Sequence, residues 1–208
     1  TLASNNQSYK ASETSIYADG IDASDINDFI LETRTYETHD SVHVDMPEYR
    51  FVATGIIENP DTSYGGVIVG LDIYDEAGAQ IFSADFSADA ALSDSDYHIY
   101  SEMMDTMGLH IVDVNFDGYK DVIILNNFYG VHGNTWYDCW LWDENAFSFA
   151  VSESFSQICN PSVDAENQCI YSIGGSGASY WGGSIYKFID GNFVVANQFS
   201  FDGRTLLE

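Results

Sequence analysis

The feature that most constrains this chain is a repeated unit: a short apolar run, an acidic turn and a second apolar run. The unit occurs at residues 71–82, 140–149 and 186–193, and Asp, Asn or Gly occupies each turn. These residues tolerate the positive φ angles that tight turns between antiparallel strands require. Each unit therefore predicts a β-hairpin.

Further short runs rich in β-branched and aromatic residues predict strands at residues 51–57, 66–74, 122–125 and 193–195. Helical periodicity is weak, and the helix candidates at residues 23–31 and 90–107 amount to about one or two turns each. We therefore expect an all-β, mostly antiparallel fold. Because repeated hairpins leave only short edges exposed, we favour an irregular β-propeller-like domain, with a β-sandwich as the alternative.

The length of 208 residues fits one all-β domain. Residues 1–22 are polar and rich in Ser and Asn, which predicts a tether or linker before a single β domain at residues 23–208. Such tethers are typical of chains that follow a removed export signal or a lipid-modified cysteine. No run of eighteen apolar residues predicts a transmembrane span. We expect an extracellular or envelope-anchored protein, possessing an export signal that this sequence does not include.

The charge balance is strongly acidic, because 33 Asp and Glu face 6 Lys and Arg and give a net charge of −27. Nucleic acid is excluded as a partner, since neutralising phosphates requires clustered Lys and Arg. A negative field concentrates cations and speeds encounter with basic proteins. Calcium and a basic protein are therefore the expected partners, and solubility alone is the other explanation of the charge.

Residues 113–121 carry oxygen-bearing side chains at the spacing of a calcium loop. Gly118 permits the sharp bend, and about six oxygens suit calcium better than the water-retaining magnesium ion. Ile124 stands where an EF-hand has Glu, and a strand-like run follows, so this is no EF-hand. An acidic turn held by side-chain hydrogen bonds, with no ion, is the alternative. The predicted ligands are the side chains of Asp113, Asn115, Asp117 and Asp121 and the carbonyl of Tyr119.

The loop with its following strand, residues 113–125, resembles the calcium loops of integrin-type FG-GAP and VCBS β-propeller repeats. From residue 111 onward the order of motifs is similar to a family of bacterial envelope proteins with a propeller-like, calcium-bound domain. That family includes an immunity protein that inhibits a lysozyme-like peptidoglycan hydrolase delivered by a type IV secretion system. The motifs are the calcium loop and residues 133–137, 140–142, 147, 158–161 and 186–187.

The resemblance implies an exported hydrolase inhibitor that inserts an aromatic side chain from a loop near the ion into the enzyme cleft. The matching positions are residues 132–137, with Tyr137 or Trp136 as the inserted residue. This chain departs from the pattern in its Asp-rich surroundings and in Cys159, which precedes Asn160. A glycine-rich stretch nearer the C-terminus contributes two further aromatic residues. The predicted partner-binding residues are therefore His132, Asn134, Trp136, Tyr137, Tyr180 and Trp181.

The glycine-rich stretch at residues 174–183 predicts a flexible loop that presents Tyr180 and Trp181 to a carbohydrate or protein. Alternatively, both rings fold back onto the core. The stretch lacks the endings of a phosphate loop and of a nucleophile elbow. Since no catalytic motif is found, we expect a recognition protein and not an enzyme. A calcium-dependent carbohydrate or surface adhesion module is the alternative, and a glycoside hydrolase with an unidentified acid pair is the second alternative.

Cysteine and histidine positions give two weaker hypotheses. Cys159 and Cys169 bracket a turn-rich stretch, which is compatible with a disulfide or with two buried thiols, and Cys139 is expected to be a buried thiol. His39 and His43 have the spacing of zinc ligands on a helix. Residues 42–46 alternate like a strand, however, where that spacing separates the side chains too far to share an ion.

Overall fold

The described part of the chain consists of strands, turns and bends. The computed structural model describes residues 31–58, 65–86, 98–100, 106, 108–129, 133–175, 181–201 and 206–207, and no helix occurs within these ranges. The predicted tether at residues 1–22 lies outside them, as do most residues of the helix candidates. Where those candidates reach the described part, at Leu31 and at residues 98–100, the chain forms strands paired with Glu58 and with β3, so the helix prediction is wrong there.

Three antiparallel sheets follow one another along the chain, and each is built mainly from sequential strands. Sheet A contains β1 (Leu31–Ser41), β2 (Glu48–Glu58), β3 (Gly65–Tyr74), β4 (Gln80–Asp85) and β5 (His98–Tyr100). Sheet B contains β6 (Leu109–Val112), β7 (Asp121–Tyr129), β8 (Asn134–Asp143) and β9 (Ser148–Val151). Sheet C contains β10 (Pro161–Asp164), β11 (Cys169–Gly175), β12 (Trp181–Ile189), β13 (Asn192–Phe201) and β14 (Leu206–Leu207).

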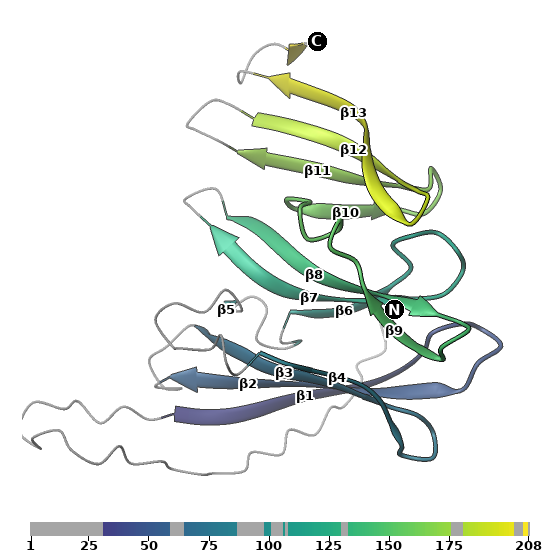
Figure 1. Cartoon of the computed structure of the whole chain (residues 1–208). Helices are drawn as coiled ribbons and strands as arrows, with labels where there is room; N and C mark the ends of the chain where they lie inside the picture. The colour runs from purple at the N-terminus through teal and green to yellow at the C-terminus, as the bar shows by residue number, and fades with distance from the viewer. Residues whose placement is uncertain are drawn as a thin grey trace, which may run out of the picture.

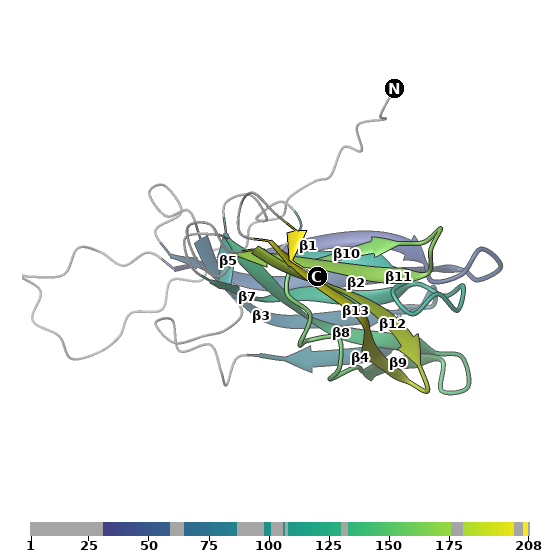
Figure 2. The same ribbon diagram turned by 90° about the horizontal axis from the view of Figure 1, so that it is seen from above.

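The sheets are stacked in chain order, with sheet B between sheets A and C (Figure 1). Seen from above, β1 and β10 run along one side of the stack and β4 and β9 along the other (Figure 2). The all-β, antiparallel prediction is confirmed. The arrangement is sandwich-like, which was the alternative architecture, and the predicted repetition of hairpins appears as one meander in each layer.

Two hydrophobic cores lie on opposite faces of sheet B. Because side chains alternate along a strand, Trp140 and Trp142 of β8 face sheet A, whereas Tyr137 and Cys139 face sheet C. The core of the A–B junction is aromatic, and the ring centroids of Trp142 and Phe149 lie 5.1 Å apart. Each large side chain buried in these cores stabilises the fold by about 1.5–3 kcal/mol. The two cores explain why apolar side chains lie on both faces of the middle sheet, as in residues 122–125 of β7.

The three predicted hairpins are confirmed as β3–β4, β8–β9 and β12–β13. The last of them turns at Asp190 and Gly191, with φ angles of 49° and 81°. Two successive positive φ angles are what a two-residue hairpin turn of this hand requires. A fourth hairpin, β10–β11, occupies the stretch between Cys159 and Cys169.

Two sequence-based assignments are wrong, one of a strand and one of a loop. Residues 42–46 do not form a strand: Ser41 pairs with Glu48, and the backbone turns between them with a 3.0 Å hydrogen bond from Met46 N–H to the His43 carbonyl. The loop predicted at residues 174–183 is wrong at both of its ends. Backbone pairing continues β11 through Gly175 and begins β12 at Trp181, which is opposite Gly175. Trp181 is therefore a half-buried strand residue.

The disulfide considered between Cys159 and Cys169 does not form, and the three cysteines are free thiols. The register of the β10–β11 hairpin is the reason, because it places Cys169 opposite Asp164. Cys159 lies farther along the hairpin, where its sulfur sits 3.1 Å from the position that a Cβ on Gly174 would occupy. Cys139 is buried, as predicted.

Candidate metal centre

The loop of residues 113–120 connects β6 to β7, and the pairing of Val112 with Asp121 brings its two ends together. A strand precedes the loop and a strand follows it, which confirms that it is not an EF-hand. Phe116 has a φ of 66° and Gly118 a φ of 95°, so the backbone bends twice within three residues. The loop thus returns on itself, and its alternate side chains have room to turn inward.

Asp113 organises the first half of the loop. Its Oδ1 accepts a hydrogen bond from Phe116 N–H at 2.7 Å, and its Oδ2 accepts one from Gly118 N–H at 3.0 Å. Both oxygens keep a second lone pair, because a carboxylate oxygen can accept more than one hydrogen bond. The side chain therefore folds over the loop and leaves acceptor capacity for a cation.

Asn115 and Asp117 continue the same inward pattern. Asn115 Oδ1 accepts Asp117 N–H at 3.1 Å, and Asp117 Oδ1 accepts Tyr119 N–H at 2.8 Å. The Asn115 amide also donates to Asp117 Oδ2 at 2.9 Å. These contacts are the side-chain hydrogen bonds of an acidic turn, and they gather oxygen atoms from positions one, three and five.

Asp121, the first residue of β7, lies at the base of the loop and is fully buried. Its Oδ2 accepts Val114 N–H and its Oδ1 accepts Trp142 N–H, both at 2.9 Å, so one carboxylate joins the loop, β7 and β8. Burial raises its pKa to about 7; the two backbone hydrogen bonds oppose this rise, and the charges of Asp117 and Asp113 add to it. Negative charge is thus concentrated around a carboxylate that water does not reach.

The chemistry of these donors fits calcium, because all of them are oxygens and calcium is a hard cation. Carboxylates alone do not complete the site: within the described ranges, no group of three or more His, Cys, Asp or Glu is placed to hold a metal. A calcium ion bound by this loop would therefore also need oxygens from Asn115 and from the Tyr119 carbonyl. Calcium takes about six to eight oxygens, so water would supply the others.

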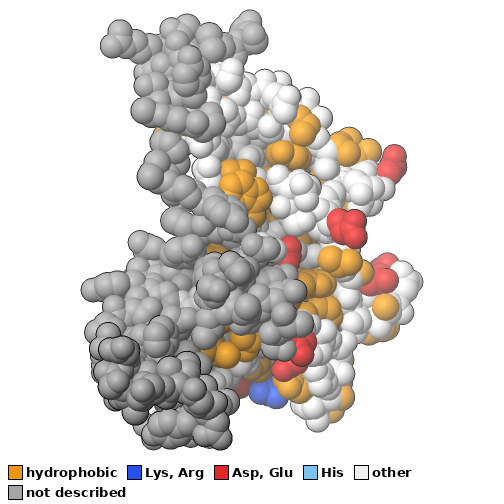
Figure 3. Space-filling view, turned by 60° about the vertical axis from the view of Figure 1, so that its left-hand side comes forward, with side chains coloured by type: hydrophobic (Ala, Val, Ile, Leu, Met, Phe, Trp, Pro, Cys, Tyr) orange, Lys and Arg blue, Asp and Glu red, His pale blue; other side chains and the backbone are white. Residues whose placement is uncertain are grey.

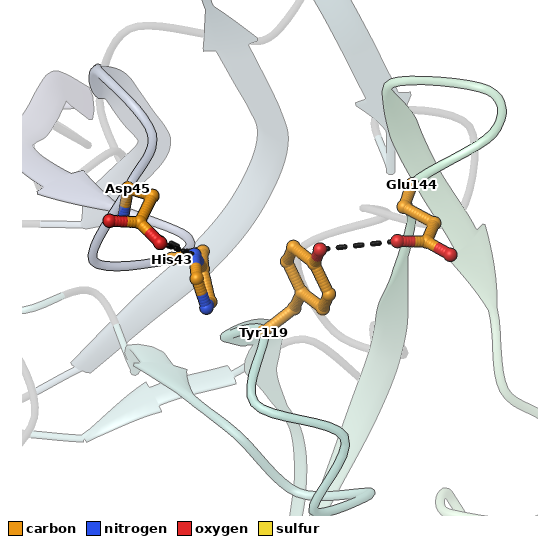
Figure 4. Close-up of polar contacts among 4 residues, drawn as sticks. All are labelled: His43, Asp45, Tyr119 and Glu144. Carbon is orange, nitrogen blue, oxygen red and sulfur yellow. Dashed lines mark hydrogen bonds and ion pairs between the residues drawn. The ribbon is translucent and has the colours of Figure 1, made fainter.

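The C-terminal half of the loop contacts two neighbouring turns (Figure 4). Tyr119 lies with its ring centroid 4.8 Å from that of His43, in the β1–β2 turn, and its hydroxyl donates to Glu144 Oε2 at 3.1 Å, in the β8–β9 turn. Lys120 Nζ donates to both oxygens of Asp40 at 2.6 and 2.8 Å. Its backbone N–H donates to the Val42 carbonyl at 2.6 Å. The loop is therefore fastened to sheet A.

A hollow of about 520 Å³ opens beside the loop. Asn115 and Asp117 line it from the loop, and Asp143 and Glu144 line it from the β8–β9 turn. Backbone N–H groups of Asn145 and Ala146 hydrogen-bond to Asp143 and hold the pKa of that carboxyl below its usual range. The hollow consequently presents negative charge at neutral pH.

The predicted partner-binding residues do not form one exposed surface. Tyr137 is only 9% exposed and packs in the core between sheets B and C, because the alternation of β8 points it inward. Its position contradicts the role of an inserted anchor. Trp136 and Trp181 are half-buried in β8 and β12. His132 and Tyr180 lie outside the described residues.

Asn134 has a structural position that the sequence did not predict. Its Nδ2 donates to the Gly175 carbonyl at 3.0 Å, and its Oδ1 accepts the Asn160 amide at 3.1 Å, so it links sheet B to sheet C. Asn160 is the centre of this contact and was missed. Its φ of 47° is one that Asn tolerates better than most residues, and an Asn before Pro161 is a turn signal that could have indicated it.

Comparison with known proteins gives little. No protein family matches the sequence, and no curated protein is similar to it. A solved structure described as "Structure of a Xanthomonas Type IV Secretion System related protein" is similar to 84% of this chain over 79% of its own length. The two are 14% identical, with a TM-score of 0.43. A likeness at this level supports no conclusion about function.

The described part of the chain contains no helix with the length and apolar character needed to cross a bilayer.

Proposed function

We propose that this chain is an exported calcium-binding protein whose function is recognition of a basic protein. The observation that carries the proposal is the acidic loop closed on Asp121, where the oxygens of Asp113, Asn115 and Asp117 gather above a buried carboxylate. Bound calcium would supply positive charge to this group. The metal is structural in this proposal, because the loop that would hold it is fastened to sheet A through the neighbouring Tyr119 and Lys120.

The charge distribution supports a basic partner. Each Lys and Arg in the described ranges already contacts a carboxylate or a carbonyl of the chain: Arg34 with Glu32, Arg50 with Glu37, Lys120 with Asp40 and Lys187 with the Asn167 carbonyl. Figure 3 shows acidic side chains spread over one face with little basic surface among them. The acidic hollow beside the loop is the place we propose for first contact. A lysozyme-like peptidoglycan hydrolase, which the sequence resemblance implies, is the proposed partner.

Calcium-dependent glycan binding is a second candidate, and one observation favours it. A hollow of about 590 Å³ lies where the first strands of the three sheets meet. Tyr36 and Thr38 of β1 and His110 of β6 line it. Aromatic rings beside hydroxyl groups suit the alternating apolar and polar surfaces of a sugar. A glycan array with calcium would show binding if this candidate is correct.

The first experiment measures calcium binding by calorimetry on the chelator-treated chain. We expect binding in the native sequence, none in the double variant Asp113→Ala, Asp117→Ala, and unchanged binding in Asp45→Asn. The last substitution removes an exposed acid of the neighbouring turn. Absence of heat and of any rise in melting temperature at millimolar calcium would overturn the metal proposal.

The second experiment measures partner binding with a basic lysozyme-like hydrolase, calcium-loaded chain and a peptidoglycan lysis assay. We expect a complex that weakens as salt rises and lysis that falls on titration. Unaffected lysis with no complex at low salt would contradict the partner proposal and leave calcium binding to be judged separately.

A further inference from the structure

The stack of sheets ends in two faces of opposite character. Sheet A and sheet C each have one face toward sheet B and one face directed away from it (Figure 1). On the outer face of sheet A, β1 exposes Thr33, Thr35, Glu37 and His39. Arg50 of β2 pairs with Glu37 at 3.1 Å. This face is hydrated and charged, as expected of a sheet surface in contact with water.

The outer face of sheet C is more apolar, and its one charged side chain on β12 is Lys187, which lies opposite Val194 and whose Nζ donates to the Asn167 and Gln168 carbonyls. The register places Tyr171 opposite Ile185, and it places Gly183 between Ile173 and Phe199. Because directly paired residues of an antiparallel sheet share a face, these side chains form one surface. The Phe199 ring lies across Gly183, since a Cβ there would sit 2.4 Å from a ring carbon. Three aliphatic side chains of this face remain substantially exposed: Ile173 by 44%, Ile189 by 51% and Val194 by 39%.

Sheet C also carries little of the net charge. Residues 152–208 contain six acids (Glu153, Asp164, Glu166, Asp190, Asp202 and Glu208) and two bases, Lys187 and Arg204, so their net charge is −4. The other 151 residues contain the remaining 27 acids and 4 bases, which gives −23. In Figure 3 the described atoms in the upper part of the molecule, where sheet C lies, are mostly white and orange. Two chains of this sequence would repel each other least through sheet C.

We propose that a second copy of this chain packs on the outer face of sheet C, forming a two-fold dimer in which the two C sheets face each other. The packing repeats the face-to-face contact of apolar sheets already present at the A–B and B–C junctions. A self-complementary face of this kind is what a two-fold interface requires. The strongly acidic sheets A and B then lie at the far ends of the dimer.

The size of the face sets the expected affinity. Four strands about 4.8 Å apart, with nine residues at about 3.4 Å each, cover roughly 600 Å². A standard interface takes about 800 Å² from each partner, so the contact is smaller than standard and we expect a weak dimer whose population depends on protein concentration. Because the copies share a net charge of −27, salt screens their repulsion and strengthens association. Salt is expected to weaken a complex with a basic partner, which is the opposite effect. The salt dependence therefore distinguishes failure of the dimer proposal from failure of the proposed function.

Analytical ultracentrifugation of the full chain tests the dimer, from about 1 to 200 μM protein at roughly 20 and 500 mM NaCl. We expect monomer at low salt and a concentration-dependent dimer at high salt. The double variant Ile173→Glu, Ile189→Glu should remain monomeric, whereas the matched variant Thr33→Glu, Thr35→Glu on sheet A should dimerise like the native chain. Thermal melting of the monomer verifies that each variant is folded.

Three results would overturn the dimer. A native chain that stays monomeric at every concentration and salt means that the face is covered by something else or by water. Dimerisation that survives in the sheet C variant, or that is lost equally in the sheet A variant, places the contact elsewhere. Association that weakens as salt rises means that the contact is between opposite charges.

Discussion

The two junctions of sheet B are closed by different kinds of polar contact. At the A–B junction, Lys120 pairs with Asp40 beside the acidic loop. At the B–C junction, the neutral Asn160 side chain accepts two hydrogen bonds from Thr135 and donates to the Asn134 side chain and to the Ile173 carbonyl. Charged contacts respond to pH, salt and metal ions, whereas neutral amide contacts respond weakly. We infer that the stability of the A–B junction depends on pH, salt and metal ions, whereas the stability of the B–C junction depends on them weakly.

The largest expected effect is that of Asp121→Ala, which removes the acceptor of two backbone N–H groups, those of Val114 and Trp142. Leaving two buried donors unpaired lowers the free energy of unfolding by about 2–5 kcal/mol. For a chain of this size the melting temperature falls by roughly 4–20 °C. Glu166→Ala, at an exposed turn, is the control and should change stability by less than about 0.5 kcal/mol. Equal melting of the two variants would show that Asp121 does not hold the loop.

The next effect concerns pH in calcium-free buffer. The pKa of Asp121 is about 7 in the folded chain and close to 3.8 when unfolded, so the folded state binds the extra proton between these values. The contribution of Asp121 to the free energy of unfolding is therefore greatest below about pH 4. It declines as the pH rises to about 7 and does not change further above that pH. The decline is on the order of a few kcal/mol.

Chemical denaturation at pH 5 and pH 8 measures this decline. Asp121→Asn removes the titrating group, and its stability should change less than that of the native chain over the same interval. Saturating calcium should also reduce the native decline. If the native chain and Asp121→Asn show the same pH dependence, the buried carboxylate does not titrate as described.

Asn160→Ala tests the B–C junction and should lower the free energy of unfolding by about 1–3 kcal/mol. Part of that loss arises from the φ of 47°, which Ala disfavours. Asn160→Gly tolerates the angle but lacks the amide, so the difference between the variants separates backbone strain from the hydrogen bonds. In urea titrations both losses should be the same with and without calcium. A calcium-dependent loss would remove the distinction between the junctions.

The smallest effect is that of Lys120→Met, because the side chains of Lys120 and Asp40 are 40% and 34% exposed and solvent screens the pair. We expect a loss of at most about 1 kcal/mol at low salt, and less at 500 mM NaCl. Urea midpoints at both salt concentrations measure it. The same loss at both concentrations would mean that packing of the Lys120 stem, and not its charge, matters here.

The sequence predicted local features well, because each is encoded in a few adjacent residues. The Asp190–Gly191 turn and the bend at Gly118 follow from glycine and Asp in turns. Strand β1 was harder to predict than its neighbours in sheet A. It reads Leu-Glu-Thr-Arg-Thr-Tyr-Glu-Thr-His-Asp-Ser, with only two apolar side chains, and it forms a strand because Ser41 through Leu31 pair with Glu48 through Glu58. Tertiary pairing of this kind overrides a weak local pattern.

The candidate site shows the same limit. The loop residues were identifiable from their spacing, and the burial of Asp121 was not, because it depends on the Trp142 amide 21 residues away. Tyr137 was predicted as an exposed anchor from a resemblance. Its direction follows from the alternation of β8 against sheet C, which requires knowing which faces of sheet B are covered.

Hydrogen exchange with and without calcium tests the central claim most directly, namely that calcium binds the acidic loop and secures the A–B junction. We predict slower exchange on adding calcium at the Phe116, Gly118 and Tyr119 amides and at Met46 in the contacting turn. The Thr135 and Asn160 amides at the B–C junction should be unchanged. Equal exchange at all of these amides, or protection at the B–C junction alone, would contradict the account.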